Sequence, residues 1–294
     1  MGVDMDKGVP HPLETSFPSG ELRPALGLGT WRFGEERSRR AAEVGALREA
    51  LAMGWRLIDT AEMYGEGGAE VVAGLAVAEA LRADVQRSEL FIVSKALPTH
   101  ASARALQTAC EASLRRLQLE QIDLYLLHWR GVVPLAETIR GFEQLQRRGL
   151  IRLWGVSNFD LDDMRELSAV PGGRACATNQ VYYSLSQRGV EHDLLPWQRV
   201  QQMPLMAYSP FDQGELVDHP RLRPVAERHR ATPAQVALAW LLRQPGVMAL
   251  PKAGNALHLR HNWAAQQLRL TADDLAELDR HFAPPEGKQP LVTR

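Results

Sequence analysis

The feature that most constrains the fold is a regular alternation of short apolar segments with longer amphipathic ones. The short segments show little polar alternation, which is typical of parallel strands that are covered on both faces. We predict strands at Ala25–Leu28, Arg56–Ile58, Leu90–Ser94, Leu124–Leu127, Arg152–Val156, Ala177–Val181, Leu205–Ala207 and Met248–Leu250. Eight strands separated by helices can form either a closed barrel or an open, doubly wound sheet.

Two of the intervening helices have clear sequence signals. Pro134 suits a first helical position, an apolar face runs through Leu135–Leu145, and Gly149 stops the helix. A second helix begins at Thr232, with Pro233 directly behind it.

The positions of the polar side chains decide between the two architectures. A polar residue directly follows most of the predicted strands, namely Asp59, Lys95, His128, Ser157 and Lys252. Barrels build their sites from the ends of many strands, whereas doubly wound sheets use one switch point. We therefore predict an α/β protein made of a single (β/α)8 barrel domain over residues 1–294. An N-terminal β-hairpin that turns at Ser19 and Gly20 is expected to cap the barrel bottom.

Composition argues against several classes of protein. Lys and Arg total 34 and Asp and Glu 35, a balance that disfavours nucleic-acid or membrane-surface binding. The sequence contains no apolar run of about 18 residues and no apolar leader, so we expect a cytoplasmic protein. Cys110 and Cys176 stand in apolar surroundings and are expected to be buried, reduced thiols.

Four residues together could protonate a carbonyl oxygen. Asp59, Lys95 and His128 end three strands, and Tyr64 lies one short loop after Asp59, so all four would meet at one rim of a barrel. Tyrosine titrates near pH ~10 and needs a cation beside it to act as an acid; Lys95 could supply that charge. Asp59 could hold Lys95, and His128 could orient the substrate oxygen.

None of these side chains is a hydride source, so the chemistry implies a nicotinamide cofactor. Each residue alone has a plainer interpretation, since a lysine or histidine after a strand is more often structural. Gly27 and Gly29 lack the third glycine of a dinucleotide fingerprint, and no Tyr-x-x-x-Lys pair is present. His258 and His261 form too isolated a pair for a metal site, and we expect no metal.

Seven motifs occur in the order known from one enzyme family. They are PALGLGTW, RLIDTAEMYG, SLRRLQLEQIDLYLLHW, GVSNF, NQVYYS, AYSP and LPKAGN. From about Glu21 to Pro285 the chain resembles the aldo-keto reductase superfamily. The resemblance implies that Asp59, Tyr64, Lys95 and His128 are the catalytic residues, and that Trp31, Tyr64, His128 and Trp129 contact a small carbonyl substrate.

The resemblance also implies a set of cofactor-binding residues. Gly29, Thr30, Trp31 and Asp59 would lie by the nicotinamide. Ser157, Asn158 and Gln180 would hydrogen-bond its carboxamide, Tyr208 would stack on its ring, and Ser209 and Pro210 would follow on the pyrophosphate side. The adenosine end would lie along the segment that holds Lys252, Ala253, Asn255, His258, Arg260 and Asn262. A helix N-terminus there would suit an anion.

Two departures from the family pattern bear on the choice of cofactor. His258 stands where NADP-preferring relatives carry arginine, and Ala253 replaces a serine or threonine. Both changes remove hydrogen bonds to a 2′-phosphate. No acidic residue between Lys252 and Asn262 is available to bind a free 2′-hydroxyl, so we predict NADPH, with room for NADH.

Within the family, AEMYGEGGAE, AVPGG, ATNQVYYSL and HDLLPW are most similar to bacterial methylglyoxal reductases and related small-aldehyde reductases. The predicted function is reduction of small α-oxo-aldehydes to alcohols through an open active-site mouth. A sugar or diketo-acid reductase is the main alternative, and a non-catalytic, nicotinamide-sensing subunit is a less favoured one. We expect a monomer or a weak oligomer.

Overall fold

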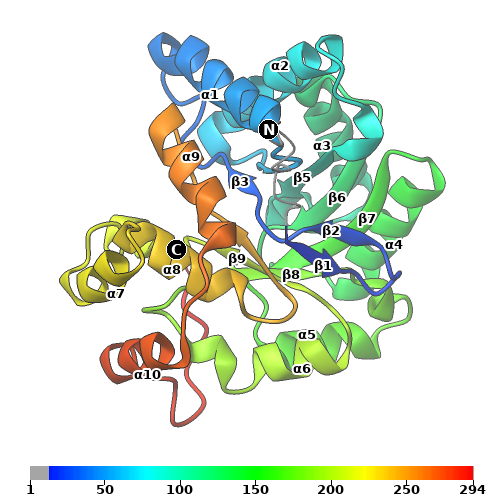
Figure 1. The fold of residues 1–294 in the computed structure, drawn as a ribbon. Coiled ribbons are helices and arrows are strands. Elements are labelled where there is room, and N and C mark those ends of the chain that lie inside the picture. The colour runs from blue at the N-terminus through cyan, green and yellow to red at the C-terminus, as the bar shows by residue number, and fades with distance from the viewer. Residues whose placement is uncertain (1–12, 294) are drawn as a thin grey trace.

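Eight parallel strands form the centre of the molecule, as the sequence predicted (Figure 1). The computed structural model describes residues 13–293, so the two ends of the predicted domain lie outside the described residues. The strands are β3 (Leu28–Gly29), β4 (Leu57–Asp59), β5 (Phe91–Ala96), β6 (Ile122–Leu127), β7 (Ile151–Ser157), β8 (Asn179–Tyr182), β9 (Leu205–Tyr208) and β10 (Val247–Leu250). Each strand pairs with the next along the chain. Parallel bridges from Leu26 to Ala249 and from Gly29 to Lys252 close the barrel.

Helices surround the strands on the outside, as Figure 1 shows. The longer ones are α1 (Arg40–Met53), α2 (Gly68–Arg82), α3 (Ala103–Leu117), α4 (Leu135–Arg147), α5 (Leu161–Ala169), α8 (Pro233–Leu242), α9 (Ala256–Ala264) and α10 (Ala272–His281). The shorter ones are α6 (Leu194–Val200) and α7 (Arg223–Arg228). A large apolar core fills the space between the helices and the barrel wall. This arrangement is the predicted (β/α)8 fold.

Each of the eight strands differs from the prediction by one to three residues at one end or both, and Asp59 and Ser157 lie inside β4 and β7 and not after them. Lys95 lies inside β5 and not after it, because β5 stays in register with β6 at Lys95 and Leu126. The first barrel strand is Leu28–Gly29 and not Ala25–Leu28. The residues before it bond to β10 instead: the Gly27 N–H donates to the Ala249 carbonyl over 2.9 Å.

The two helix signals are correct to within a residue. Thr232 caps α8, and its side chain and that of Gln235 exchange the hydrogen bonds of a capping box. Pro134 is the residue before α4 and not its first helical residue. Gly149 follows α4 with a left-handed backbone (φ 71°), a conformation that costs glycine little.

The predicted N-terminal hairpin is present and closes the bottom of the barrel. Strands β1 (Glu14–Ser16) and β2 (Leu22–Pro24) pair antiparallel. Phe17, directly after β1, is buried in the barrel interior with its ring 5.5 Å from that of Phe91. The interior of the lower barrel is therefore packed with side chains, which leaves the opposite, C-terminal rim for a site.

The two-residue period of a strand explains which polar groups reach that rim. Leu57, Val93 and Leu126 belong to the buried interior cluster. The side chains two residues further along β4, β5 and β6 point the same way, and they belong to Asp59, Lys95 and His128. The apolar pattern of the strands therefore places these polar side chains one layer above a packed core.

The two cysteines are buried, as predicted, and neither forms a disulfide. Burial raises the pKa of each thiol to about 12, so both stay protonated at neutral pH. Within residues 13–293, no helix is long and apolar enough to cross a membrane. The same part of the chain has no cluster of His, Cys, Asp and Glu side chains arranged to hold a metal.

Candidate active site

A cavity opens at the C-terminal rim of the barrel and brings together most of the predicted site residues. Counting the part open to solvent, it encloses about 1290 Å³. Among the predicted residues that line it are Gly29, Trp31, Asp59, Tyr64, His128, Ser157, Asn158, Gln180, Tyr208, Ser209, Pro210 and Lys252. Residues from seven different strand ends thus converge on one space.

Asp59 and Lys95 form a buried ion pair at the floor of this cavity. The Lys95 Nζ donates to both carboxylate oxygens of Asp59, over 2.9 and 2.8 Å, and to the Thr60 carbonyl over 2.9 Å. Lys95 is fully buried and Asp59 is 3% exposed. Burial alone would lower the pKa of Lys95, but the charges and hydrogen bonds of Asp59 and Tyr64 together outweigh it and raise that pKa. Lys95 is therefore a fixed positive charge at neutral pH.

The Tyr64 hydroxyl lies 3.4 Å from that ammonium group. Burial raises the pKa of Tyr64, and the Lys95 charge opposes the rise. The Lys95 cation alone, which is what the sequence shows, would lower the pKa of Tyr64, but desolvation of the buried hydroxyl is the larger effect. Tyr64 is therefore protonated at neutral pH, which is the state that a proton donor needs.

Glycines fix the loop that carries Tyr64. Gly65 has a left-handed backbone (φ 57°), and a Cβ there would lie 2.8 Å from the Phe33 carbonyl oxygen. A Cβ on Gly34 would lie 2.2 Å from the Gly68 backbone. The loop after β3 can therefore pack directly on the Tyr64 loop only because side chains are absent from both.

His128 lies directly after β6, as predicted, and its ring faces the Tyr64 ring edge-on at 5.7 Å. The side chain is 6% exposed, and its Nδ1 has no hydrogen-bond partner among the described residues. Burial and then the Lys95 charge lower the pKa of His128 to about 3. His128 is therefore a neutral imidazole in the physiological range and can offer a hydrogen bond but not a proton of its own.

The residues predicted to hold a carboxamide form one network. Asn158, which has a left-handed backbone (φ 59°), donates from Nδ2 to the His128 carbonyl over 3.1 Å and to Ser157 Oγ over 3.3 Å. Its Oδ1 accepts from the Tyr208 hydroxyl over 2.8 Å. Gln180 donates from Nε2 to Asp59 over 2.8 Å. The network joins the ends of β6, β7, β8 and β9 to the ion pair.

Apolar side chains surround the mouth of the cavity. Trp31, Met63 and Trp129 are 40%, 40% and 38% exposed. Trp31 and Met63 line the cavity, and the Trp129 ring lies 5.0 Å from that of His128. Thr30 is fully buried, and its hydroxyl donates to the Asp59 carbonyl over 3.0 Å. The mouth of the cavity is open to solvent, as predicted.

The predicted adenosine segment comprises the loop after β10 and most of α9. Asn255 caps α9, accepting the His258 N–H over 2.9 Å, and its Nδ2 lies 3.1 Å from His258 Nδ1. Lys252 lines the cavity, whereas Ala253 is buried. Burial, followed by the charge of Arg39, lowers the pKa of Lys252. The first turn of α9 begins four residues after Lys252, and a helix N-terminus suits an anion.

Arg260 and Asn262 differ in their surroundings. Arg260 forms an ion pair with Glu49 of α1, with Nη1 and Oε1 3.0 Å apart. Asn262 is 3% exposed, and its Nδ2 has no hydrogen-bond partner within residues 13–293. The Asn262 Nδ2 is thus a buried donor without a partner among the described residues, whereas the Arg260 side chain is paired with a residue of α1.

Sequence reasoning missed the loop that follows β9. Phe211, Gln213, Gly214 and Val217 line the cavity together with Ser209 and Pro210. Ser209, Asp212 and Gln213 all have positive φ angles between 49° and 54°. We call residues 209–217 the strap. Only Ser209 and Pro210 were predicted, because beyond them the strap has no regular apolar period and three of its positive φ angles fall on residues other than glycine.

Comparison with known proteins agrees with this site. The model of the Aldo/keto reductase family matches residues 25–283. Methylglyoxal reductase YeaE of Escherichia coli (strain K12) is 48% identical over 279 residues, which cover 93% of this chain and 96% of that protein. Methylglyoxal reductase DkgB of Escherichia coli O157:H7 is 32% identical over 91% of this chain and 98% of its own length.

A solved structure is similarly close. The aldo/keto reductase from Klebsiella pneumoniae, crystallised in complex with NADP and acetate, superimposes with a TM-score of 0.91 at 44% identity. The match covers 97% of this chain and all of that one. The family model spans the whole barrel, and YeaE and the Klebsiella pneumoniae enzyme both exceed 40% identity. This chain belongs to the aldo/keto reductase family.

Proposed function

We propose that this protein reduces aldehydes and ketones to alcohols with NADPH, and that small α-oxo-aldehydes such as methylglyoxal are preferred. The observation that carries the proposal is the Tyr64 hydroxyl, 3.4 Å from a buried ammonium group at the floor of an open cavity. Relatives named as methylglyoxal reductases and a relative crystallised with NADP support it.

The side chains around the cavity fit a nicotinamide dinucleotide. Lys252 lines the cavity and offers a positive charge for phosphate; beyond the cavity, the first turn of α9 suits an anion and Asn262 has a buried Nδ2 without a partner among the described residues. Ser157, Asn158 and Gln180 would hold the carboxamide, and the Tyr208 ring would carry the nicotinamide. When bound, the reduced cofactor supplies the hydride.

The chain's own residues supply the proton. The carbonyl carbon accepts the hydride, and Tyr64 donates its hydroxyl proton to the carbonyl oxygen. Lys95 stabilises the resulting phenolate, and Asp59 holds Lys95 in place. His128 is neutral and donates one ring N–H to the same oxygen, which orients the carbonyl. Tyr64 is partly exposed and can regain its proton from solvent.

The charge of the cavity favours neutral substrates. Lys252 is the only Lys or Arg among the described residues that line it, and this residue belongs to the proposed cofactor side. The substrate side consists of Trp31, Met63 and the neutral His128. We expect kcat/KM for methylglyoxal to exceed that for a diketo sugar acid or an aldose by at least about tenfold, the scale of one unpaired buried polar or charged group. A steady-state panel of these substrates with NADPH measures this; equal or reversed values would favour the sugar-acid reductase.

Cofactor choice gives a second expected result. A histidine at position 258 does not offer the fixed cationic fork that arginine presents to a phosphate. His258→Arg should therefore tighten NADPH binding by roughly 1 to 2 kcal/mol and leave NADH binding nearly unchanged.

The measurement is the Kd of each cofactor by quenching of tryptophan fluorescence. His281→Arg makes the same substitution in the last turn of α10 and serves as the control. Equal NADPH and NADH affinities in the wild type, or an unchanged NADPH Kd in His258→Arg, would show that this segment does not recognise the phosphate.

A further inference from the structure

We propose that Tyr182 is a positioning residue with two separable roles: its ring supports Tyr208 from behind, and its hydroxyl ties down the strap. This inference rests on the proposed function, in which Tyr208 carries the nicotinamide ring. Tyr182 is outside the set of residues that the family resemblance assigned to the site, and it makes no contact with the cavity itself.

The register of the barrel sets the two tyrosines face to face. Tyr182 of β8 is the direct partner of Tyr208 of β9 in the parallel ladder. Registered side chains on neighbouring strands point the same way and lie about 5 Å apart. The two rings are in fact stacked, with centroids 5.5 Å apart and planes only 9° from parallel. An offset stack of this kind is attractive and restricts ring rotation.

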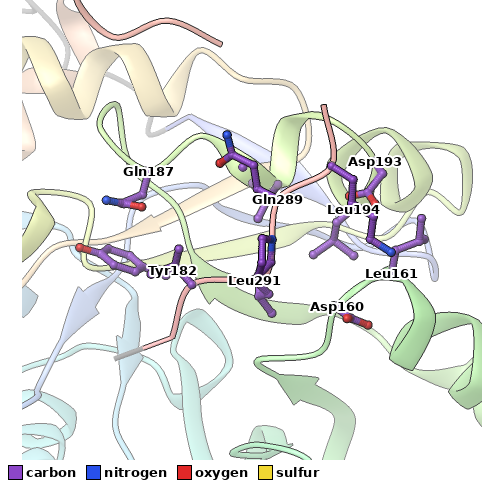
Figure 2. Close-up of a pocket in the computed structure, with 13 residues that line it drawn as sticks. Asp160, Leu161, Tyr182, Gln187, Asp193, Leu194, Gln289 and Leu291 are labelled. Atoms are coloured by element: carbon purple, nitrogen blue, oxygen red, sulfur yellow. The ribbon is translucent and has the colours of Figure 1, made fainter. Parts of the chain in front are cut away.

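Burial shows which face of Tyr208 the stack covers. Tyr208 lines the cavity and is partly exposed, whereas Tyr182 is 2% exposed and lines a different, smaller pocket. Figure 2 shows Tyr182 at one end of that pocket, beside Gln187, with Gln289 and Leu291 of the C-terminal segment alongside. Tyr182 therefore packs against the face of Tyr208 that is turned away from the cavity. Asn158 holds the Tyr208 hydroxyl, so the ring is restrained at its tip and on one face.

The hydroxyl of Tyr182 makes the second connection. It donates to one carboxylate oxygen of Asp212 in the strap, and Ser186 Oγ donates to the other over 2.6 Å. Asp212 has a left-handed backbone (φ 49°) and lies between two other residues of the strap, Ser209 and Gln213, with the same property. A run of such residues persists only where surrounding contacts hold it. Asp212 therefore fastens the strap to the end of β8 and to the loop after it.

These contacts assign different consequences to the ring and the hydroxyl. Losing the hydroxyl removes one of the two hydrogen bonds that hold the Asp212 carboxylate. The strap, which borders the proposed pyrophosphate side, should then be looser, and bound cofactor should dissociate faster. Losing the ring frees Tyr208 to tilt away from the geometry needed for hydride transfer, a step that is sensitive to small displacements. If Tyr182 had only a structural role, its variants would lower the stability of the protein without changing cofactor dissociation and hydride transfer separately.

The adjacent residue provides a matched control. Tyr183 is also buried and donates its hydroxyl to a carboxylate, that of Glu191 over 2.8 Å, but its ring packs on Trp240 outside the barrel. Tyr182→Phe should raise the NADPH dissociation rate roughly three- to tenfold, the scale of one hydrogen bond, and leave the single-turnover rate of hydride transfer within about twofold of wild type. Tyr183→Phe should change neither rate, even if both variants lose similar stability.

Two leucine variants test the ring and separate this inference from the proposed function. Tyr182→Leu should lower the single-turnover hydride-transfer rate about tenfold at saturating NADPH, with Tyr182→Phe as its rescue. Tyr208→Leu should impair both NADPH binding and hydride transfer. If Tyr208→Leu behaves like wild type, Tyr208 does not carry the nicotinamide ring, and that part of the proposed function is wrong. If Tyr208→Leu is impaired but both Tyr182 variants match Tyr183→Phe, only the role of Tyr182 is overturned.

Discussion

Tyr64→Phe is expected to lower kcat for methylglyoxal reduction by a factor of about 10² to 10⁴, the range typical for loss of a general acid. The substitution removes only the hydroxyl that lies 3.4 Å from Lys95 Nζ and leaves a ring to pack edge-on against His128. The melting temperature and the NADPH Kd should therefore stay close to those of the wild type. Steady-state kinetics, thermal unfolding and fluorescence titration measure the three quantities.

Tyr125→Phe provides the matched control for this experiment. Tyr125 is fully buried between β6 and α4, where its ring meets Phe142 edge-on, and it does not line the cavity. Loss of the Tyr125 hydroxyl should leave kcat within about twofold of the wild-type value, as expected of a change outside the reacting groups. A Tyr64→Phe enzyme that kept more than about a tenth of wild-type kcat would rule out Tyr64 as the proton donor.

The second large effect is expected at the ion pair. Lys95→Met removes the cation beside Tyr64, which raises the Tyr64 pKa further and makes its phenolate harder to form. Activity should be lost across the accessible pH range. The same change leaves the Asp59 carboxylate buried without its partner, which costs about 3 to 5 kcal/mol of stability.

The double variant separates the two losses. In Asp59→Asn/Lys95→Met the buried charge is gone, so part of the stability should return while activity stays low. The activity losses of the single variants should be far from additive, with a coupling above about 1 kcal/mol, because the residues act as one unit. Asp274→Asn removes a buried acid whose partners are Arg228 and His229, away from the cavity. That control should lose stability and keep kcat. Additive activity losses at Asp59 and Lys95 would show that they do not share one network.

The sequence was sufficient to predict the barrel and the four residues that meet at the floor of the cavity. The reason is the strand period: Val93, two residues before Lys95, is apolar and packs inward, so the face that Lys95 occupies is determined by its neighbour. The helix start at Thr232 was equally predictable, because a cap depends on residues within one turn.

The remaining features depend on contacts between distant segments, which a single sequence does not reveal. Arg260 was interpreted from its own motif, yet its ion-pair partner, Glu49, is more than 200 residues away on α1. The pairing of Tyr182 with Asp212 requires the path of an irregular strap. The Tyr64 pKa was misjudged because a sequence shows a nearby cation more readily than it shows burial.

The central claim, that this chain transfers a hydride from NADPH to a carbonyl group while Tyr64 supplies the proton, has one direct test. NADPH carrying deuterium at both C4 positions is incubated with methylglyoxal and either wild-type or Tyr64→Phe protein, and the alcohol product is analysed by mass spectrometry. We expect one deuterium on the carbinol carbon of each product molecule, with product formed in step with NADPH consumption. With Tyr64→Phe we expect almost no product. NADPH binding without consumption in the wild type, for methylglyoxal and for every other carbonyl in the panel, would contradict it and would favour a nicotinamide-sensing subunit.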